Sequence, residues 1–232
     1  MVDYRNLRLN NLRTPEFRHL LLLIYWPIYG LTFWLLERGL TLDYRAIESS
    51  FDSRIPFCEY FVIPYYLWFV FLAGIHIYTL LFDVPAFKKL MYFIIITYTV
   101  TTVIYIVYPN KQELRPTEFA RDNIFVNIVK MLYGFDTNTN VCPSLHVIGS
   151  FAVLFTTWQC RRFKNVRDQI WIILLTVLIS ISTVFLKQHS IIDVIAGLAV
   201  CAVSYPAAYI LPDKIRPVSY THLRAHETRR HL

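Results

Sequence analysis

Charged residues are scarce in this 232-residue sequence: Asp, Glu, Lys and Arg make up 17%, whereas 56% of the residues are hydrophobic. Soluble domains carry about 25% charged residues. The mean hydropathy of +0.42 therefore excludes an ordinary soluble enzyme. Glycine is also rare, with 6 residues, which argues against a Gly-rich nucleotide-binding loop.

The four cysteines show neither a CxxC pair nor the mixed Cys/His spacing of a metal site. Cys160 and Cys201 lie in apolar runs and are expected to be small buried hydrophobes. A disulfide between Cys58 and Cys142 is left open. From this pattern we predict no metal and no cofactor.

The C-terminal stretch 218–232 differs in composition from everything before it. Its residues 218–228 resemble one translated frame of a common sequencing adapter, so we treat the stretch as a non-native tail. The alternative is a native basic cytoplasmic tail. Excluding the tail leaves four of the seven histidines: His19, His76, His146 and His189.

Long apolar runs predict an all-α, polytopic membrane protein, because about 20 apolar residues are needed to cross the hydrocarbon core as a helix. We expect a six-helix membrane domain over 19–211, with a core at about 90–211. The predicted helices are 19–36, 60–82, 90–108, 143–160, 169–186 and 190–211. The first run lacks a small-x-small cleavage site at 37–41 and is predicted to be a retained anchor.

Lys and Arg set the predicted orientation, since they gather in cytoplasmic loops. They cluster in the N-terminal segment 1–18, around 88–89, in 161–167 and in the end segment 212–217. These four places share one side if the helices alternate, so both termini are predicted to be cytoplasmic. The same rule accounts for the net charge of +7 without a nucleic-acid partner.

The loop from Pro109 to Cys142 contains an apolar periodicity that predicts an amphipathic helix. The apolar positions are Ile124, Phe125, Ile128, Met131 and Leu132. The pair Pro116–Thr117 is a suitable start for it. Such a helix would lie on the outer membrane surface near the entrance to a site, or only pack on the bundle.

Three short polar motifs are brought to the outer side by the alternation of the helices. They are Arg115-Pro116, Pro143–His146, and Lys187–His189 followed by Asp193. Ionisable groups beside hydrocarbon are costly and tend to mark function. We therefore expect the three motifs to form one site on the extracytoplasmic face of an integral cell membrane protein.

The residue types suit phosphoryl transfer. A neutral imidazole can attack phosphorus, which makes His189 the predicted nucleophile. Asp193, four residues later, lies one helical turn away and can orient His189. His146 is the predicted general acid toward the leaving oxygen and later the base toward water.

Cations and amides supply the predicted phosphate-binding groups. Arg115 offers a fork of donors, Lys187 a point charge, and Ser144 a hydroxyl. Pro143 suits the first position of a helix, whose free amides favour an anion. Because these groups neutralise a phosphate, the mechanism needs no metal.

Each residue also has a plainer interpretation. Ser190 and Asp193 match a helix-capping box, and one carboxylate can cap and orient at once. His146 alone would be a helix-packing histidine, and Ser144 a helix-start residue. Lys187 can extend its amine to the interface.

The motifs PSLH and HSIID, preceded by RP, resemble the type 2 phosphatidic acid phosphatase (PAP2) superfamily over about 108–211. The resemblance implies a six-helix bundle, with His146 as the acid/base group and His189 as the nucleophile partnered by Asp193. PSLH alone is a weak signal, but its combination with HxxxD is strong.

Two positions depart from the family pattern. Tyr108 stands where the first motif has Lys, and Thr183 where the third has Arg. Lys111 and Lys187 are candidates to replace these charges, although Lys111 also fits a solvated loop. The variant pattern is similar to the branch of inositol phosphorylceramide synthases and their bacterial relatives.

Three functions are therefore considered. The first is a membrane phosphatase that hydrolyses a lipid phosphate or diphosphate through a phosphohistidine. The second is a phosphotransferase that passes the group to an alcohol. The third is a non-catalytic membrane scaffold, against which the presence of His146, His189 and Asp193 argues. The expected partners are a lipid phosphate substrate and membrane lipids.

Overall fold

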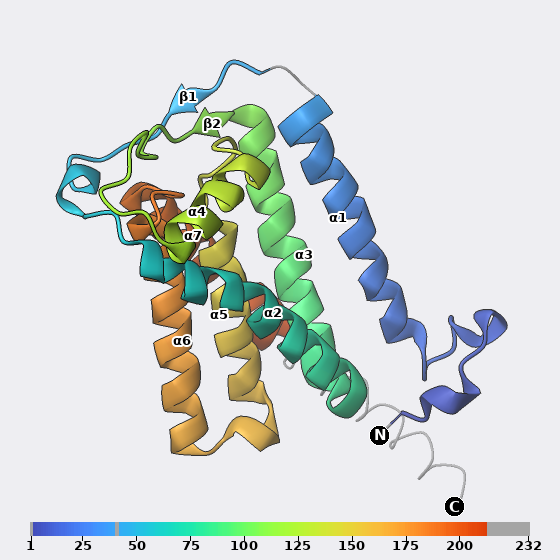
Figure 1. The fold of residues 1–232 in the computed structure, drawn as a ribbon. Helices are drawn as coiled ribbons and strands as arrows, with labels where there is room; N and C mark the ends of the chain where they lie inside the picture. The colour runs from blue at the N-terminus through green and yellow to red at the C-terminus, as the bar shows by residue number, and fades with distance from the viewer. Residues whose placement is uncertain (1, 40–41, 213–232) are drawn as a thin grey trace, which may run out of the picture.

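The computed structural model describes residues 2–39 and 42–212, and this part of the chain folds into a helical bundle (Figure 1). The predicted tail at 218–232 lies outside the described residues. The α-helices of the described ranges are α1 Tyr25–Trp34, α2 Val62–Phe82, α3 Val84–Val107, α4 Ile124–Phe135, α5 Leu145–Gln159, α6 Val166–Phe185 and α7 Ile191–Tyr205. A 3-10 helix, Arg18–Ile24, and a π-helical turn, Leu35–Gly39, extend α1 at its two ends, and a second π-helical turn, Pro206–Ile210, extends α7.

Five segments of the described chain are long and apolar enough to cross a membrane. They are Arg18–Gly39, Glu59–Phe82, Val84–Val107, Val166–Phe185 and Ile191–Ile210. The polytopic helical architecture is thus confirmed. The remaining predicted crossing is α5, which has 15 residues and at about 1.5 Å per residue spans about 22 Å.

The shorter helix α5 forms the centre of the bundle and packs against α2, α3, α6 and α7. Gly149 on α5 makes one of these contacts possible, since an added Cβ would lie 2.7 Å from Nε1 of Trp68. Leu90, Phe93 and Ile148 are fully buried in the same cluster. By contrast, α1 stands at the edge of the bundle beside α3 (Figure 1).

The third predicted helix begins earlier than expected. The carboxylate of Asp83 caps α3 by accepting from the N–H of Ala86 at 3.2 Å, and a proline occupies the first turn. These two start signals bring Lys88 and Lys89 into the helix, whereas we predicted a loop there. The amine of Lys89 contacts Oε1 of Gln159 at 3.1 Å.

The predicted amphipathic helix is present as α4, but it begins at Ile124 and not at Pro116–Thr117. The side chain of Asn123 caps it by accepting from the N–H of Val126 at 3.0 Å. The buried face is Val126, Val129 and Leu132, whereas Ile124 and Met131 are exposed. The buried face is therefore rotated about the helix axis from the predicted one, because α4 packs against α2 and the 3-10 turn Glu59–Phe61.

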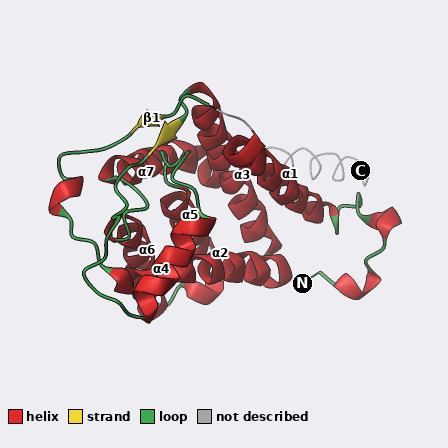
Figure 2. Cartoon of the chain, turned by 45° about the horizontal axis from the view of Figure 1, so that its top comes forward, coloured by secondary structure: helices red, strands yellow, loops and turns green. Residues whose placement is uncertain are grey.

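The long loops that contain β1 (Arg45–Ala46), β2 (Asn110–Lys111) and α4 gather at one end of the bundle (Figures 1 and 2), opposite the turn between α5 and α6 (Figure 1). The two short strands pair in parallel and join these loops. The N–H of Cys58 also donates to the carbonyl of Phe185 at 3.1 Å. All four cysteines are free, so Cys58 and Cys142 form no disulfide.

Candidate active site

His189 lies in the tight turn that joins α6 to α7. The N–H groups of Gln188 and His189 both donate to the carbonyl of Thr183, at 2.9 and 3.1 Å. Lys187 has a φ of 53°, the left-handed conformation that commonly ends a helix. This turn places His189 directly before the first turn of α7.

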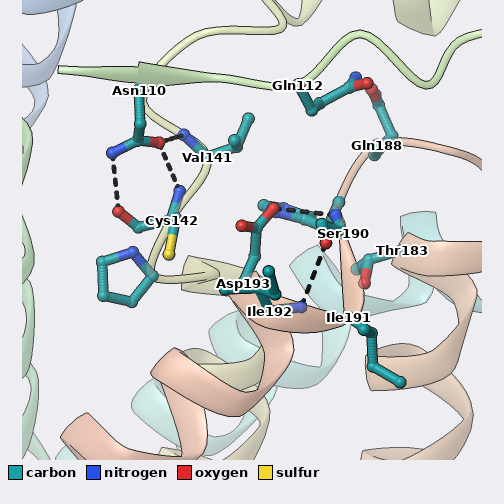
Figure 3. A network of polar contacts seen from close by, with 12 residues as sticks. Asn110, Gln112, Val141, Cys142, Thr183, Gln188, Ser190, Ile191, Ile192 and Asp193 are labelled. Atoms are coloured by element: carbon teal, nitrogen blue, oxygen red, sulfur yellow. Dashed lines mark hydrogen bonds and ion pairs between the residues drawn. The ribbon is translucent and has the colours of Figure 1, made fainter. Parts of the chain in front are cut away.

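The ring of His189 contacts Asp193, with 3.1 Å between Nδ1 and Oδ2. The same Oδ2 accepts the backbone N–H of Ser190 at 3.0 Å, and the side chain of Ser190 accepts from the N–H of Ile192 at 3.2 Å (Figure 3). The carboxylate therefore caps α7 and contacts the imidazole at once. With the proton on Nδ1, Nε2 of His189 keeps its lone pair.

His146 comes from the first turn of α5 and lies beside His189, with 5.8 Å between the ring centroids. Its ring packs against those of Tyr65 and Trp68, at centroid distances of 4.3 and 4.5 Å. Its Nε2 atom is buried and has no hydrogen-bond partner among the described residues. The two predicted catalytic histidines are thus neighbours.

Both histidines line one cavity at the loop end of the bundle. Its other walls are Phe33, Tyr105, Asp136, Thr137, Thr139, Asn140, Val141, Leu145 and Gln188. The four predicted phosphate-binding side chains, Lys111, Arg115, Ser144 and Lys187, do not line this cavity.

Arg115 connects the loop after α4 to the turn that carries His189. Its guanidinium donates to the carbonyls of Tyr133, Asp136 and Thr137 at 3.1, 3.0 and 2.8 Å. It also donates to Oε1 of Gln188 at 2.5 Å. Burial lowers the pKa of Arg115 from its ordinary value, and the carbonyls stabilise the charge.

The Lys187 amine points to the loop between the first two spans, where it donates to the carbonyls of Asp52 at 2.7 Å and Ile55 at 2.5 Å. Burial lowers the pKa of Lys187, and the negative charge of Asp52 opposes that effect. An ammonium has three donors, and these contacts use two of them.

Ser144, within the Pro143–His146 motif, and Lys111, four residues before Arg115, also do not line the cavity. Ser144 precedes α5, its N–H donates to the carbonyl of Asp193 at 3.0 Å, and its buried hydroxyl has no partner within residues 2–39 and 42–212. Lys111 forms an ion pair with Glu113 at 2.5 Å and is partly exposed.

Asn110 is a site residue that the sequence analysis missed. Its Oδ1 accepts the N–H groups of Val141 at 2.9 Å and Cys142 at 2.8 Å, and its Nδ2 donates to the carbonyl of Cys142 at 2.9 Å (Figure 3). These bonds hold the turn that leads into Pro143–His146. Nδ2 also donates to the carbonyl of Tyr108 at 3.0 Å, and a buried amide that satisfies four backbone groups is a strong positional constraint.

Two carboxylates were also missed: Asp136, which lines the cavity, and Glu37, which bonds to residues that line it. Asp136 accepts the hydroxyl of Tyr65 at 2.8 Å and Nε2 of Gln188 at 3.3 Å. Glu37, at the end of the first span, accepts from the side chains of Thr137, Thr139 and Asn140. An acidic residue that ends an apolar run was the available signal for Glu37.

The two positions that depart from the family pattern have local partners. The guanidinium of Arg45 stacks over the ring of Tyr108 at 5.0 Å, because the β1–β2 pairing sets Arg45 opposite Asn110. Thr183 donates from its hydroxyl to the carbonyl of Ser180 at 2.8 Å. A cation thus lies beside Tyr108, and Thr183 serves the turn at His189 through its carbonyl.

The chain was compared with known proteins in three ways. The sequence model of the PAP2 superfamily matches residues 86–217, which is more than half of the chain. No curated protein and no solved structure matches. In the residues that the structure describes, no group of three or more His, Cys, Asp or Glu side chains is arranged to hold a metal ion.

Proposed function

Because the chain belongs to the PAP2 superfamily, we propose that it is a membrane enzyme that hydrolyses a lipid phosphate or diphosphate through a phosphohistidine on His189. The observation that carries this proposal is the arrangement of His189, Asp193 and His146 at one cavity. A nucleophile, the group that orients it, and a second imidazole are the parts that a two-step displacement requires.

In the first step, Nε2 of His189 attacks phosphorus and the bond from phosphorus to the leaving oxygen breaks. Protonated His146 gives its proton to that oxygen. Asp193 accepts from Nδ1 of His189 and stabilises the positive charge that the ring acquires. The phosphoryl group is then bound to His189, and His146 is neutral.

In the second step, water attacks the phosphohistidine and His146 takes a proton from it. The N–P bond breaks, inorganic phosphate leaves, and both histidines return to their starting states. Amides in the first turn of α5 stabilise the phosphate oxygens, because a helix start favours an anion. The other proposed phosphate-binding residues are Arg115, Ser144, Lys187 and Lys111, although their side chains do not line the cavity in this structure. No metal takes part in the proposed reaction.

The proposed membrane placement follows from the charges. Both termini are cytoplasmic, and the cavity with its loops faces the extracytoplasmic side. A lipid substrate then keeps its tail in the bilayer while its head group reaches the histidines. The loop end and the turn between α5 and α6 lie at opposite ends of the bundle (Figure 1), which supports this arrangement.

A phosphotransferase is the second candidate function. The observation that favours it is Asp136, a carboxylate that lines the same cavity as both histidines. A carboxylate oxygen accepts hydrogen bonds and would orient the hydroxyl of an alcohol. In that reaction the alcohol replaces water in the second step.

The test is phosphate release from a panel of lipid phosphates and diphosphates in detergent with EDTA present. Wild type is compared with His189→Ala and with the control His19→Ala, which changes a histidine in the 3-10 helix that precedes α1. We expect release by wild type and the control that His189→Ala loses. Transfer of the phosphoryl group to an added alcohol, with a phosphate ester formed in place of inorganic phosphate, indicates the transferase. Equal release by His189→Ala contradicts the mechanism, and no turnover by any route favours the scaffold.

A further inference from the structure

A short segment between the first two spans lies across the turn that carries His189. We call residues 49–55 the strap. The Lys187 amine donates to two strap carbonyls, those of Asp52 and Ile55. On the other side of His189, the Asp52 carboxylate accepts from Ser190 and Ile191. The strap therefore binds the turn both before and after the proposed nucleophile.

The carboxylate of Asp52 is buried, with 1% of the residue exposed. Its Oδ2 accepts the hydroxyl of Ser190 at 2.6 Å and the N–H of Ser49 at 2.7 Å, and its Oδ1 accepts the N–H of Ile191 at 2.9 Å. Burying a carboxylate is costly unless its oxygens are bonded. Here three donors and the positive end of α7 stabilise it.

The bonds continue without a gap from Asp52 to the proposed nucleophile. Ser190 donates from its hydroxyl to Asp52 and from its backbone N–H to Oδ2 of Asp193. That same oxygen contacts Nδ1 of His189. The position of Asp193 relative to the imidazole thus depends on a first turn of α7 that Asp52 holds from outside.

We propose that Asp52 is a positioning residue for the His189–Asp193 pair. It does not line the cavity, and it lies outside the residues that the family model matches. Its effect passes through Ser190 and the first turn of α7. The kinetic consequence rests on the proposed function, but the effect on the imidazole of His189 does not.

The competing explanation is an ordinary helix cap that only stabilises the fold. A cap of that kind contributes about 0.5–2 kcal/mol to stability. Its loss would lower the unfolding temperature without changing which ring nitrogen of His189 carries the proton. The test must therefore include a readout of the imidazole.

The experiment uses the full chain in detergent and compares wild type with Asp52→Asn. Asn keeps the volume and one acceptor, but its NH₂ group cannot accept. Either the hydroxyl of Ser190 or the N–H of Ile191 therefore loses its acceptor. Glu48→Gln is the matched control, because Glu48 is exposed in the same loop. A second variant, Ser190→Ala, removes the hydroxyl that donates to Asp52 and leaves Asp52 itself unchanged.

The first readout is kinetic. For Asp52→Asn we expect kcat on a turned-over lipid phosphate to fall by about tenfold or more, with KM changed by less than about threefold. Glu48→Gln should match wild type. The double variant with Ser190→Ala should lose little more than either single variant, since both act on one series of bonds.

The second readout is the ¹⁵N spectrum of labelled histidine, with the His189 signal assigned by its loss in His189→Ala. In wild type we expect the Nδ1–H form, and in Asp52→Asn a mixture with the Nε2–H form. An unchanged His189 signal in both Asp52→Asn and Ser190→Ala overturns the proposal, as does an unchanged kcat. If wild type turns over no lipid phosphate, the proposed function fails and the spectrum alone decides on Asp52.

Discussion

Oδ2 of Asp193 contacts Nδ1 of His189 at 3.1 Å and accepts the N–H of Ser190 at 3.0 Å. One oxygen atom thus combines a helix cap with the orientation of an imidazole. An amide in place of the carboxylate removes the negative charge beside the imidazole, while its oxygen still offers an acceptor for the N–H of Ser190.

Asp193→Asn should therefore abolish most activity without unfolding the protein. If the amide oxygen takes the place of Oδ2, both contacts remain, but the negative charge that stabilises the imidazolium of His189 is lost. If the NH₂ group takes that place, it faces Nδ1 of His189 and favours the wrong tautomer. We expect kcat to fall by about 10²- to 10⁴-fold, as in other sites where a carboxylate orients a histidine. Kinetics and thermal unfolding measure the two effects. The control is Asp168→Asn, because Asp168 lies on α6 in an ion pair with Arg162. A near-wild-type kcat for Asp193→Asn would contradict the assignment.

Gly149→Ala tests the packing behind His146. The added methyl group would lie 2.7 Å from Nε1 of Trp68, and Trp68 packs against the ring of His146. Overpacking of this kind costs about 1–3 kcal/mol, so the unfolding temperature should fall and activity should fall with it.

The matched control is Gly74→Ala on α2, where the new methyl group meets nothing within 4 Å. Because alanine favours a helix more than glycine by about 1 kcal/mol, this variant should be neutral or slightly stabilised. Equal destabilisation of both variants would show that the Gly149–Trp68 contact is not the cause.

Lys187→Met separates two roles of the amine. If its main role is to hold the strap through the carbonyls of Asp52 and Ile55, the loss of two charge-assisted bonds should cost about 1.5–3 kcal/mol each at most. If its third donor binds the phosphate, KM for the lipid phosphate should rise as well. Thermal unfolding and KM are measured together. The control is Lys130→Met, because Lys130 is an exposed residue of α4. A variant with unchanged stability and unchanged KM would exclude both roles.

Local patterns predicted the parts of this protein that depend on neighbours in sequence. The apolar runs located the spans, and the four-residue spacing of His189 and Asp193 predicted that they meet on one helical turn. The start of α3 was missed although Asp83 and Pro85 are recognisable start signals, because the two lysines that follow suggested a loop.

The remaining parts depend on contacts between distant segments. Asp52 and Ser190 are 138 residues apart, and Glu37 and Asn140 are 103 apart. No periodicity in the sequence therefore predicts either contact. The direction of the Lys187 side chain follows from its left-handed backbone. A glycine at this position would have indicated such a backbone, whereas a lysine does not. The predicted cations were therefore recognisable by type, while the contacts of Arg115 and Lys187 with backbone carbonyls were not.

Glu37→Ala tests the support that the first span gives to two residues of the cavity wall. Glu37 accepts from Asn140 at 2.6 Å and from Thr139 at 2.8 Å, and both of these residues line the cavity. Without the carboxylate, the buried donors lose their acceptor, at a cost of about 1–3 kcal/mol. Because Glu37 contacts neither histidine, we expect KM to rise by about three- to tenfold while kcat changes less. The KM of Glu37→Gln should lie between the KM of Glu37→Ala and that of wild type. Glu48→Ala, a change of an exposed residue, should leave KM at the wild-type value. A large fall in kcat at constant KM would instead place Glu37 in the chemical step.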